Sequence, residues 1–172
     1  MQDILIVVDM QNDFINGALG TPEAVNIVNN VKSLIESFTG KVYYTRDTHY
    51  QNYLETKEGK NLPIVHCVKD SYGWQITSEL SGLRCDGIID KPTFGSLELV
   101  NLILKENDAE SINSITLCGL CTDICVISNA MLLKSALLDS EIVVVSNACA
   151  GVTPLSHENA LNAMKMCQIK II

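Results

Sequence analysis

A cysteine lies where the local sequence favours a reactive thiolate. An apolar run is broken at Gly119, and Thr122 and Asp123 then suit a helix start, because their side-chain oxygens can accept hydrogen bonds from free N–H groups. Cys125 falls in the first helical turn, where unpaired N–H groups and the helix dipole favour an anion. The pattern indicates a nucleophilic cysteine, with a buried core cysteine as the alternative.

Further polar groups directly follow other apolar runs: Asp9, the pair Asp47 and His49, and Lys91. In an open parallel sheet, ligands bind beyond the carboxyl ends of the strands. We therefore expect these groups to converge with Cys125 at one edge. Singly, each could be a turn cap, a partner in a loop ion pair or a solvated side chain. Together they would require coincidences at four strand ends, so we favour a functional site.

The alternation of apolar runs and helical patterns predicts the architecture. Strands are expected at residues 4–8, 42–45, 87–89, 115–118, 142–145 and 169–172, and helices at residues 22–37, 96–107, 123–138 and 156–166. Pro22 suits a first helical position behind Thr21 as cap, and Ser156 can cap the last helix. Runs that are apolar throughout suit a parallel sheet with helices on both faces. We predict a doubly wound α/β fold with six mostly parallel strands, as one domain over residues 1–172.

The charge and cysteine content exclude several classes of protein. A net charge of −8 argues against nucleic acid or an anionic membrane as partner. No apolar run approaches the roughly 20 residues of a membrane span. The seven cysteines are an odd number in a chain without a visible export signal, so they do not indicate a disulfide framework. We expect a cytoplasmic protein.

The irregular stretch at residues 46–75 carries a second group of polar residues. Asp47 and His49 are two positions apart and would face the same side of an extended chain, and Glu58 and His66 follow. Two histidines with two carboxylates suit a divalent transition metal, Zn²⁺, Mn²⁺ or Fe²⁺. Solvated loop histidines are the alternative.

Three motifs together resemble the isochorismatase-like cysteine hydrolase superfamily, and most of all its nicotinamidase/pyrazinamidase group. They are VDMQNDF at residues 8–14, KPTFGS at 91–96 and GLCTDICV at 119–126, and the similarity spans essentially the whole chain. The resemblance implies a catalytic triad of Asp9, Lys91 and Cys125. It also implies hydrolysis of a C–N bond, because members that cleave a vinyl ether lack this cysteine.

These residue types suit the chemistry. Asp9 can take the thiol proton and later protonate the leaving ammonia, while Lys91 is expected to lower the pKa values of the thiol and the carboxyl group. Attack by Cys125 on an amide gives an oxyanion and then a thioester. The resemblance assigns the oxyanion to the backbone N–H groups of Cys121 and Cys125, and implies a cis peptide between Leu120 and Cys121.

The resemblance also strengthens the metal interpretation. Asp47, His49 and His66 would be ligands, with Glu58 as the variable acidic ligand and Glu55 as its rival. In that group the metal binds the pyridine nitrogen of the substrate and orients its ring.

The substrate is less closely specified. Phe14 matches an aromatic residue of the group, and Trp74 or Tyr53 could also contact a ring. Residues 62–64, Leu-Pro-Ile, stand where these enzymes often have an aromatic residue. Nicotinamide is the first candidate for a small-molecule amide substrate, and other small amides, ureido or carbamoyl compounds remain alternatives.

Two interpretations from other functional classes stay open. Cys118 and Cys121 form a C-x-x-C motif, which can mark a dithiol redox centre, although a helix start after Cys121 argues against it. A non-catalytic binding protein could also use this fold. The apolar residues of the helix at 123–138 are expected in the core, with a homo-oligomer interface as the alternative.

Overall fold

A six-stranded sheet forms the centre of the computed structural model, which describes residues 1–172. Its strands are β1 (Gln2–Val8), β2 (Lys41–Asp47), β3 (Gly87–Lys91), β4 (Ile112–Leu120), β5 (Glu141–Ala150) and β6 (Lys170–Ile171). Their spatial order is β3-β2-β1-β4-β5-β6, and every neighbouring pair is parallel. The chain builds outward from β1 first on one side and then on the other. This confirms the predicted doubly wound sheet.

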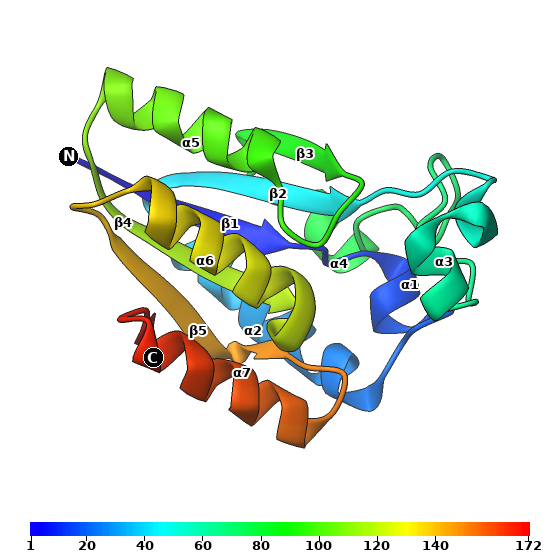
Figure 1. Cartoon of the computed structure of the whole chain (residues 1–172). Coiled ribbons are helices and arrows are strands. Elements are labelled where there is room, and N and C mark those ends of the chain that lie inside the picture. The colour runs from blue at the N-terminus through cyan, green and yellow to red at the C-terminus, as the bar shows by residue number, and fades with distance from the viewer.

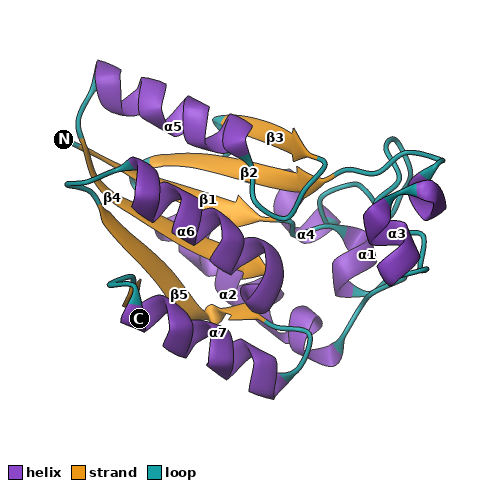
Figure 2. Cartoon of the chain, in the orientation of Figure 1, coloured by secondary structure: helices purple, strands orange, loops and turns teal.

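Helices cover both faces of the sheet. The long helices are α2 (Pro22–Ser37), α5 (Leu97–Ala109), α6 (Ile127–Ala136) and α7 (Pro154–Met166). Helices α5, α6 and α7 lie on one face and α2 lies on the other (Figures 1 and 2). The short helices are α1 (Asn12–Ile15), η1 (Tyr53–Glu55), α3 (Lys57–Asn61), α4 (Ser78–Ser81) and η2 (Thr122–Val126). None of the helices combines the length and the apolar character that crossing a membrane requires.

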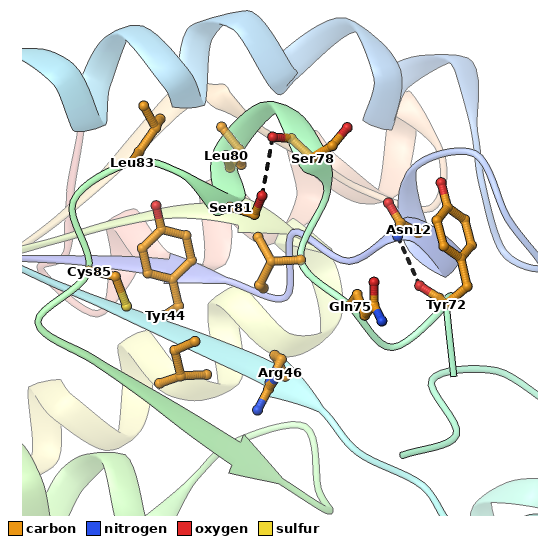
Figure 3. Close-up of a pocket in the computed structure, with 12 residues that line it drawn as sticks. Asn12, Tyr44, Arg46, Tyr72, Gln75, Ser78, Leu80, Ser81, Leu83 and Cys85 are labelled. Atoms are coloured by element: carbon orange, nitrogen blue, oxygen red, sulfur yellow. Dashed lines mark hydrogen bonds between the residues drawn. The ribbon is translucent and has the colours of Figure 1, made fainter. Parts of the chain in front are cut away.

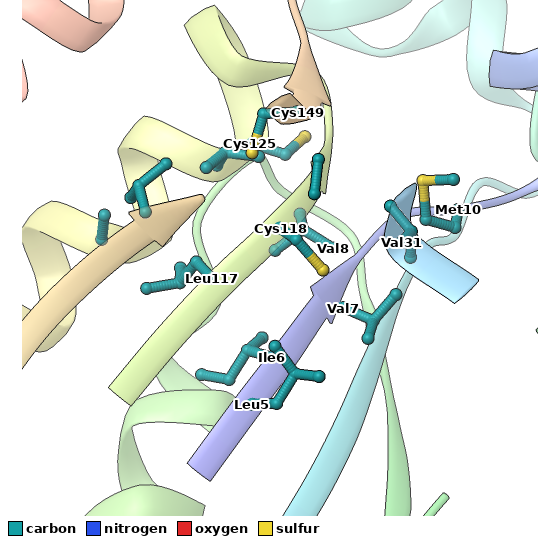
Figure 4. Close-up of a cluster of buried hydrophobic side chains, with 14 of the residues drawn as sticks. Leu5, Ile6, Val7, Val8, Met10, Val31, Leu117, Cys118, Cys125 and Cys149 are labelled. Carbon is teal, nitrogen blue, oxygen red and sulfur yellow. The ribbon is translucent and has the colours of Figure 1, made fainter. Parts of the chain in front are cut away.

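The core is built on the two central strands, β1 and β4. Side chains of β1 from Ile4 to Val8 are completely buried, and they pack with Leu117 and Cys118 of β4 (Figure 4). Helices cover both faces of these strands, so both faces must be apolar, which explains the uninterrupted hydrophobic runs. Burial of each such aliphatic side chain contributes about 1.5–3 kcal/mol.

The helix boundaries follow local capping chemistry. Thr21 accepts a hydrogen bond from the Ala24 N–H at 3.1 Å, with Pro22 in the first turn, as predicted. The prediction that Ser156 caps the last helix is wrong. Pro154 begins α7 two residues earlier, because its fixed φ suits a first turn, and Thr153 is the cap. Ser156 instead forms the reciprocal half of a capping box with Thr153.

Two segments differ in secondary structure from the prediction. The stretch at residues 46–75 contains η1 and α3, and α3 begins where the Thr56 hydroxyl accepts from the Gly59 N–H at 3.0 Å. The helix predicted at 123–138 is divided into the π-helical turn η2 and the α-helix α6. Both irregular features lie at the carboxyl edge of the sheet.

Candidate active site

Asp9, Lys91 and Cys125 meet at the carboxyl edge of the sheet. They come from the end of β1, the end of β3 and the turn after β4, near the end where α1 and α3 lie (Figure 1). Lys91 Nζ lies 2.6 Å from Asp9 Oδ2 and 3.4 Å from Cys125 Sγ. Asp9 and Lys91 are 0% exposed and Cys125 is 4% exposed. The convergence predicted from the strand ends therefore occurs, and it produces a buried cation between a carboxyl group and a thiol.

The backbone holds Asp9 in an uncommon conformation. Its φ of 49° lies in the left-handed region, which costs a non-glycine residue of order 1–3 kcal/mol. The conformation is supported by β2, because the Thr45 hydroxyl donates to Asp9 Oδ1 at 2.6 Å and the Asp9 N–H donates to the Thr45 carbonyl at 3.2 Å. One carboxyl oxygen thus faces Thr45 and the other faces Lys91.

Burial sets the protonation state of this trio. Burial and the nearby Asp9 carboxyl raise the pKa of Cys125 well above its ordinary value, although Lys91 acts in the opposite direction. Burial likewise raises the pKa of Asp9, against the effect of Lys91. Lys91 therefore acts on both groups in the predicted direction, but loss of solvation outweighs it, so the net shift of each pKa is upward and not downward. Burial alone would lower the pKa of Lys91, but Asp9, Cys125 and Asp47 raise it, so its ammonium stays charged.

The turn after β4 is shaped by Gly119 and by a cis peptide bond. Gly119 has a φ of +113°, and a Cβ there would lie 2.1 Å from the Val8 carbonyl oxygen, so only glycine fits. The peptide between Leu120 and Cys121 is cis, as the resemblance implied. The N–H groups of Ile124 and Val126 both donate to the Cys121 carbonyl, whereas the Cys121 N–H makes no hydrogen bond within the protein.

The side chains of Thr122 and Asp123 do not cap the helix, contrary to prediction. The Thr122 hydroxyl lies 2.7 Å from His157 Nδ1 on α7, and the Asp123 carboxylate accepts from the Val152 N–H at 3.2 Å. Cys121 occupies the cap position instead. Both polar side chains therefore join the cysteine turn to the start of α7, a tertiary role that local sequence could not reveal.

Asp47, His49, Glu58 and His66 form one cluster, with potential ligand atoms that all lie within 4.8 Å of one another. Asp47 Oδ2 is 3.0 Å from His49 Nε2 and 3.6 Å from His66 Nε2, and Glu58 Oε1 is 3.5 Å from His49 Nε2. Glu55, the rival acidic candidate, is exposed at the end of η1 and does not belong to the cluster.

The cluster has the properties of a metal site. His66 Nδ1 lies 2.7 Å from the Ile64 carbonyl, which can only accept, so Nδ1 carries a proton and Nε2 is the nitrogen that faces the cluster. His49 Nε2 is buried and, although Asp47 Oδ2 lies 3.0 Å away, the angle of approach does not make a hydrogen bond, which is costly unless another group occupies that direction. Although burial acts in the opposite direction, His49, His66 and Lys91 lower the pKa of Asp47, so it is ionised. Two imidazoles and two carboxyl groups suit Zn²⁺, Mn²⁺ or Fe²⁺.

Asp47 owes its position to Gln11, two residues beyond Asp9. The buried Gln11 side-chain amide accepts from the Asp47 N–H at 2.7 Å and donates to the Asp47 carbonyl at 2.9 Å. It also donates to the Trp74 carbonyl at 2.9 Å. The motif that contributes Asp9 therefore also fixes the first residue of the metal-type cluster. Gln11 was not among the predicted site residues, since an amide side chain in a turn carries no chemical signal by itself.

One cavity of about 600 Å³ connects the cysteine with this cluster. Its lining includes Cys125 and Cys121 together with Asp47, Glu58 and His66. The remaining wall is largely apolar, with Lys57 and Asn61 of α3 among its few polar residues; it includes Phe14, Leu19, Leu62, Phe94, Ile124 and Val152. Such a volume and lining are typical of small-molecule sites.

The aromatic residues of the cavity differ in part from those predicted. Phe14 lines the cavity, with its ring centroid 5.6 Å from that of His66. Tyr53 is buried behind the cluster, 4.5 Å from the His49 ring, and its hydroxyl donates to the Leu62 carbonyl. Phe94, which was not among the predicted site residues, also lines the cavity from the turn after Lys91. Its place in KPTFGS, three residues after Lys91, was the available signal.

The structure does not bring Trp74 to this cavity. The Arg46 guanidinium lies 3.6 Å from the Trp74 ring centroid, and Trp74 Nε1 donates to the Thr48 hydroxyl at 2.8 Å. Arg46 instead lines a separate cavity of about 350 Å³, together with Tyr44 (Figure 3). Tyr44 and Arg46 alternate along β2 with the residues that face the site, so they point to the opposite side of the sheet.

The C-x-x-C motif lacks the features of a redox pair. Cys118 is 0% exposed within β4, and burial raises its pKa well above the ordinary value (Figure 4). Burial likewise raises the pKa of Cys121 to about 12. A dithiol centre needs an accessible thiolate of low pKa, and neither cysteine supplies one.

Comparisons with known proteins agree with this geometry. A family model described as the isochorismatase domain matches residues 3–172. A nicotinamidase from Schizosaccharomyces pombe is 25% identical over an alignment of 207 positions, which covers 98% of this chain and 91% of that protein.

Two solved structures are similar over nearly their full lengths. The pyrazinamidase of Pyrococcus horikoshii, determined in complex with zinc, has a TM-score of 0.83 at 30% identity and covers 100% of this chain and 99% of its own. The N-carbamoylsarcosine amidase of Thermoplasma acidophilum has a TM-score of 0.82 at 28% identity, with coverage of 99% and 95%.

Proposed function

Because the chain belongs to the isochorismatase family, we propose that it is a cysteine-dependent amidohydrolase that converts nicotinamide, or a close heteroaromatic amide, to the acid and ammonia. It is a hydrolase of non-peptide C–N bonds, like the nicotinamidase and the amidase to which it is similar. The observation that carries the proposal is that Cys125 lines the same cavity as Asp47, Glu58 and His66.

The first step is a proton transfer from Cys125 to Asp9. Before the transfer, Lys91 neutralises an Asp9 carboxylate beside a neutral thiol; after it, Lys91 neutralises a thiolate beside a neutral acid. The total charge of the trio is unchanged, so the step does not add a net charge to a buried site. The raised pKa values of Asp9 and Cys125 are consistent with this interpretation, because together the pair retains one proton.

The thiolate then attacks the amide carbonyl and the oxygen becomes an oxyanion. We assign its stabilisation to the backbone N–H groups of Cys121 and Cys125, and the unpaired Cys121 N–H supports this. One such donor is typically worth about 10²–10³ in rate. Asp9 returns its proton to the leaving nitrogen, so that ammonia departs and a thioester forms. Asp9 then takes a proton from the water that attacks the thioester and returns it to the departing sulfur, which releases the acid and restores the Cys125 thiol and the Asp9 carboxylate.

Asp47, His49, Glu58 and His66 would hold a divalent transition metal. When bound, the metal supplies a Lewis acid that can accept the ring nitrogen of a heteroaromatic amide as a ligand. The chain's own contribution is to place this ring position and the Cys125 thiol in one cavity, and to surround the ring with the apolar side chains of Phe14 and Phe94.

The test is release of ammonia from nicotinamide, pyrazinamide and a panel of ureido compounds, by protein with and without prior chelation. Nicotinamide and pyrazinamide should be hydrolysed, and chelation should reduce both rates. Cys125→Ala should abolish turnover, whereas Cys118→Ala should keep it, because Cys118 lies in the core. Undiminished hydrolysis by Cys125→Ala would contradict the nucleophile, and hydrolysis of ureido compounds alone would contradict the substrate.

A carbamoyl or ureido substrate is the second candidate, favoured by the cavity wall. Leu62, rather than an aromatic residue, lines the wall contributed by the segment before His66. Lys57 gives that wall a cation that could pair with the carboxylate of a carbamoyl amino acid. Under this alternative, Lys57→Gln should raise the KM for such acids and leave the KM for nicotinamide unchanged.

A further inference from the structure

Asn129 connects the segment that carries Lys91 with the segment that carries Cys125. It lies on α6, is 0% exposed, and is outside the family motifs described above. Its Oδ1 accepts from the Ser96 N–H at 2.9 Å, and its Nδ2 donates to the Phe94 carbonyl at 3.1 Å and to the Cys125 carbonyl at 2.8 Å. The amide has two donor hydrogens and one oxygen, so all of its polar atoms are engaged.

The partners of Asn129 belong to two segments that must be placed accurately relative to each other. Phe94 and Ser96 lie in the turn after β3, in which the Thr93 carbonyl also accepts from Lys91 Nζ at 3.2 Å. Cys125 lies one helical turn before Asn129. The only direct contact between the reactive side chains of the two segments is the 3.4 Å approach of Lys91 Nζ to Cys125 Sγ.

Close packing between the turn after β3 and α6 supports this link between the two segments. A Cβ at Gly95 would lie 2.7 Å from Leu132 Cδ1 and 3.4 Å from Ser128 Cβ, so this turn lies directly against α6. Ser128 and Leu132 provide the apolar contact, and Asn129 provides the directional one. Buried hydrogen bonds of this kind define relative position more sharply than apolar contact does, because they depend on direction as well as distance.

We propose that Asn129 is a positioning residue, which holds the Pro92–Ser96 turn against the cysteine turn and thereby keeps the Lys91 ammonium beside Cys125. This inference rests on the proposed function only in taking Cys125 as the nucleophile. The charged groups that act on the Cys125 thiol are Asp9, Lys91 and Asp47, and Lys91 is the only cation among them. Displacement of Lys91 leaves the two carboxyl groups as its charged neighbours, so the thiolate becomes harder to form.

The discriminating variant is Asn129→Ser. A serine at this position can still donate to the carbonyl four residues earlier, as Ser128 does to the Ile124 carbonyl at 2.6 Å, but it cannot reach Phe94 or Ser96. Asn129→Asp is the second variant, since it keeps the shape but turns an oxygen toward two carbonyl groups. Ser128→Ala is the matched control, because it removes a side-chain hydrogen bond within the helix and none to the lysine turn.

The readout is the rate of iodoacetamide modification at Cys125, followed by mass spectrometry from pH 6 to pH 10 on folded protein. For Asn129→Ser and Asn129→Asp, we expect the apparent pKa of Cys125 to rise by about one pH unit, with roughly tenfold slower modification at pH 7. The kcat for amide hydrolysis should fall by a similar factor with little change in KM. Ser128→Ala should match the parent protein in all three measurements.

The outcomes separate this inference from the proposed function. An unchanged pH profile in both Asn129 variants would overturn the positioning role, and so would failure of both to fold, because Asn129 would then serve the fold alone. An unreactive Cys125 in the parent protein would instead refute the proposed nucleophile before any variant is compared. A shifted profile in a protein that hydrolyses none of the amides tested would support the positioning role without the proposed substrate.

Discussion

Lys91 Nζ lies 3.8 Å from Asp47 Oδ1, so one buried ammonium group adjoins both polar constellations of the site. The other Asp47 oxygen faces His49 and His66, while the same lysine is 2.6 Å from Asp9. The cation therefore balances one carboxylate beside Cys125 and another in the histidine cluster. A change of charge at Asp9 or at Asp47 should therefore alter the electrostatic environment of the other carboxylate through Lys91.

Replacing that cation should affect both stability and catalysis. Lys91→Met leaves Asp9 and Asp47 without their buried partner, and we expect a loss of about 3–5 kcal/mol in the free energy of unfolding. Amide turnover should fall by about 100-fold or more, since the thiolate loses its neighbouring charge. Urea denaturation and steady-state kinetics measure the two effects.

The control is Lys170→Met, which removes an exposed partner of Glu141 at 3.2 Å. It should cost less than about 1 kcal/mol and leave turnover unchanged. Equal effects of the two substitutions would contradict the role given to the buried lysine.

His49 should be needed for metal binding, and less so for the thiol. His49→Ala removes a cluster ligand, and we expect at least about 100-fold weaker zinc binding, because even outer contacts to metal ligands are worth 10–100-fold. Elemental analysis of the parent protein should show about one metal ion per chain, because the four potential ligands form one cluster. Modification of Cys125 by iodoacetamide should continue in the variant.

His157 is the matched control, as the only histidine outside the cluster. His157→Ala should retain the metal. Retention of metal by His49→Ala would contradict its role as a ligand. Full nicotinamide turnover by metal-free parent protein would show that the reaction does not need the metal.

The buried thiols should make the fold sensitive to alkali. Burial raises the pKa of Cys118 well above its ordinary value, so its thiol stays protonated in the folded protein. Stability from this group is complete below the unfolded pKa of about 8.5 and is lost as pH rises above it, by about 1.4 kcal/mol per pH unit. The same sign holds for four further thiols with raised pKa values, at Cys67, Cys121, Cys125 and Cys149.

Urea denaturation between pH 7.5 and pH 10, in reducing buffer, measures this dependence. Cys118→Ala should lower stability at neutral pH, because it leaves a small cavity, yet its stability should fall less steeply with pH. Cys167→Ala, at an exposed cysteine, should keep the parent's slope. A parent protein whose stability does not change with pH over this range would contradict the assignment of protonated buried thiols.

Gly119 should tolerate no side chain. In Gly119→Ala the new Cβ would meet the Val8 carbonyl at a φ of +113°, so β1 and β4 must separate or the turn must change. We expect a loss of at least about 1–3 kcal/mol and much slower modification of Cys125. Gly82→Ala, where a Cβ meets nothing within 4 Å, should change stability by less than about 1 kcal/mol. Thermal unfolding of the two variants gives the comparison.

The sequence alone was enough to predict the sheet and the convergence of its polar residues. Strands covered on both faces must be apolar throughout, so β1 and β4 were visible as uninterrupted runs. Parallel strands end at one edge, so residues that follow them, such as Asp9 and Lys91, had to approach each other. Asp47 and His49 joined one cluster because alternate residues of an extended chain face the same way.

Tertiary structure decided what depends on neighbours distant in the sequence. Burial reversed the expected pKa shift of Cys125, since desolvation is a property of the packed site and not of a helix start. Helix α3 places Glu58, and not Glu55, beside Asp47 and the two histidines, while Trp74 stacks on Arg46 outside the cavity. Asn129 reaches backbone groups 33 and 35 residues away, and only folding could bring these together, because local sequence specifies conformation but not distant partners.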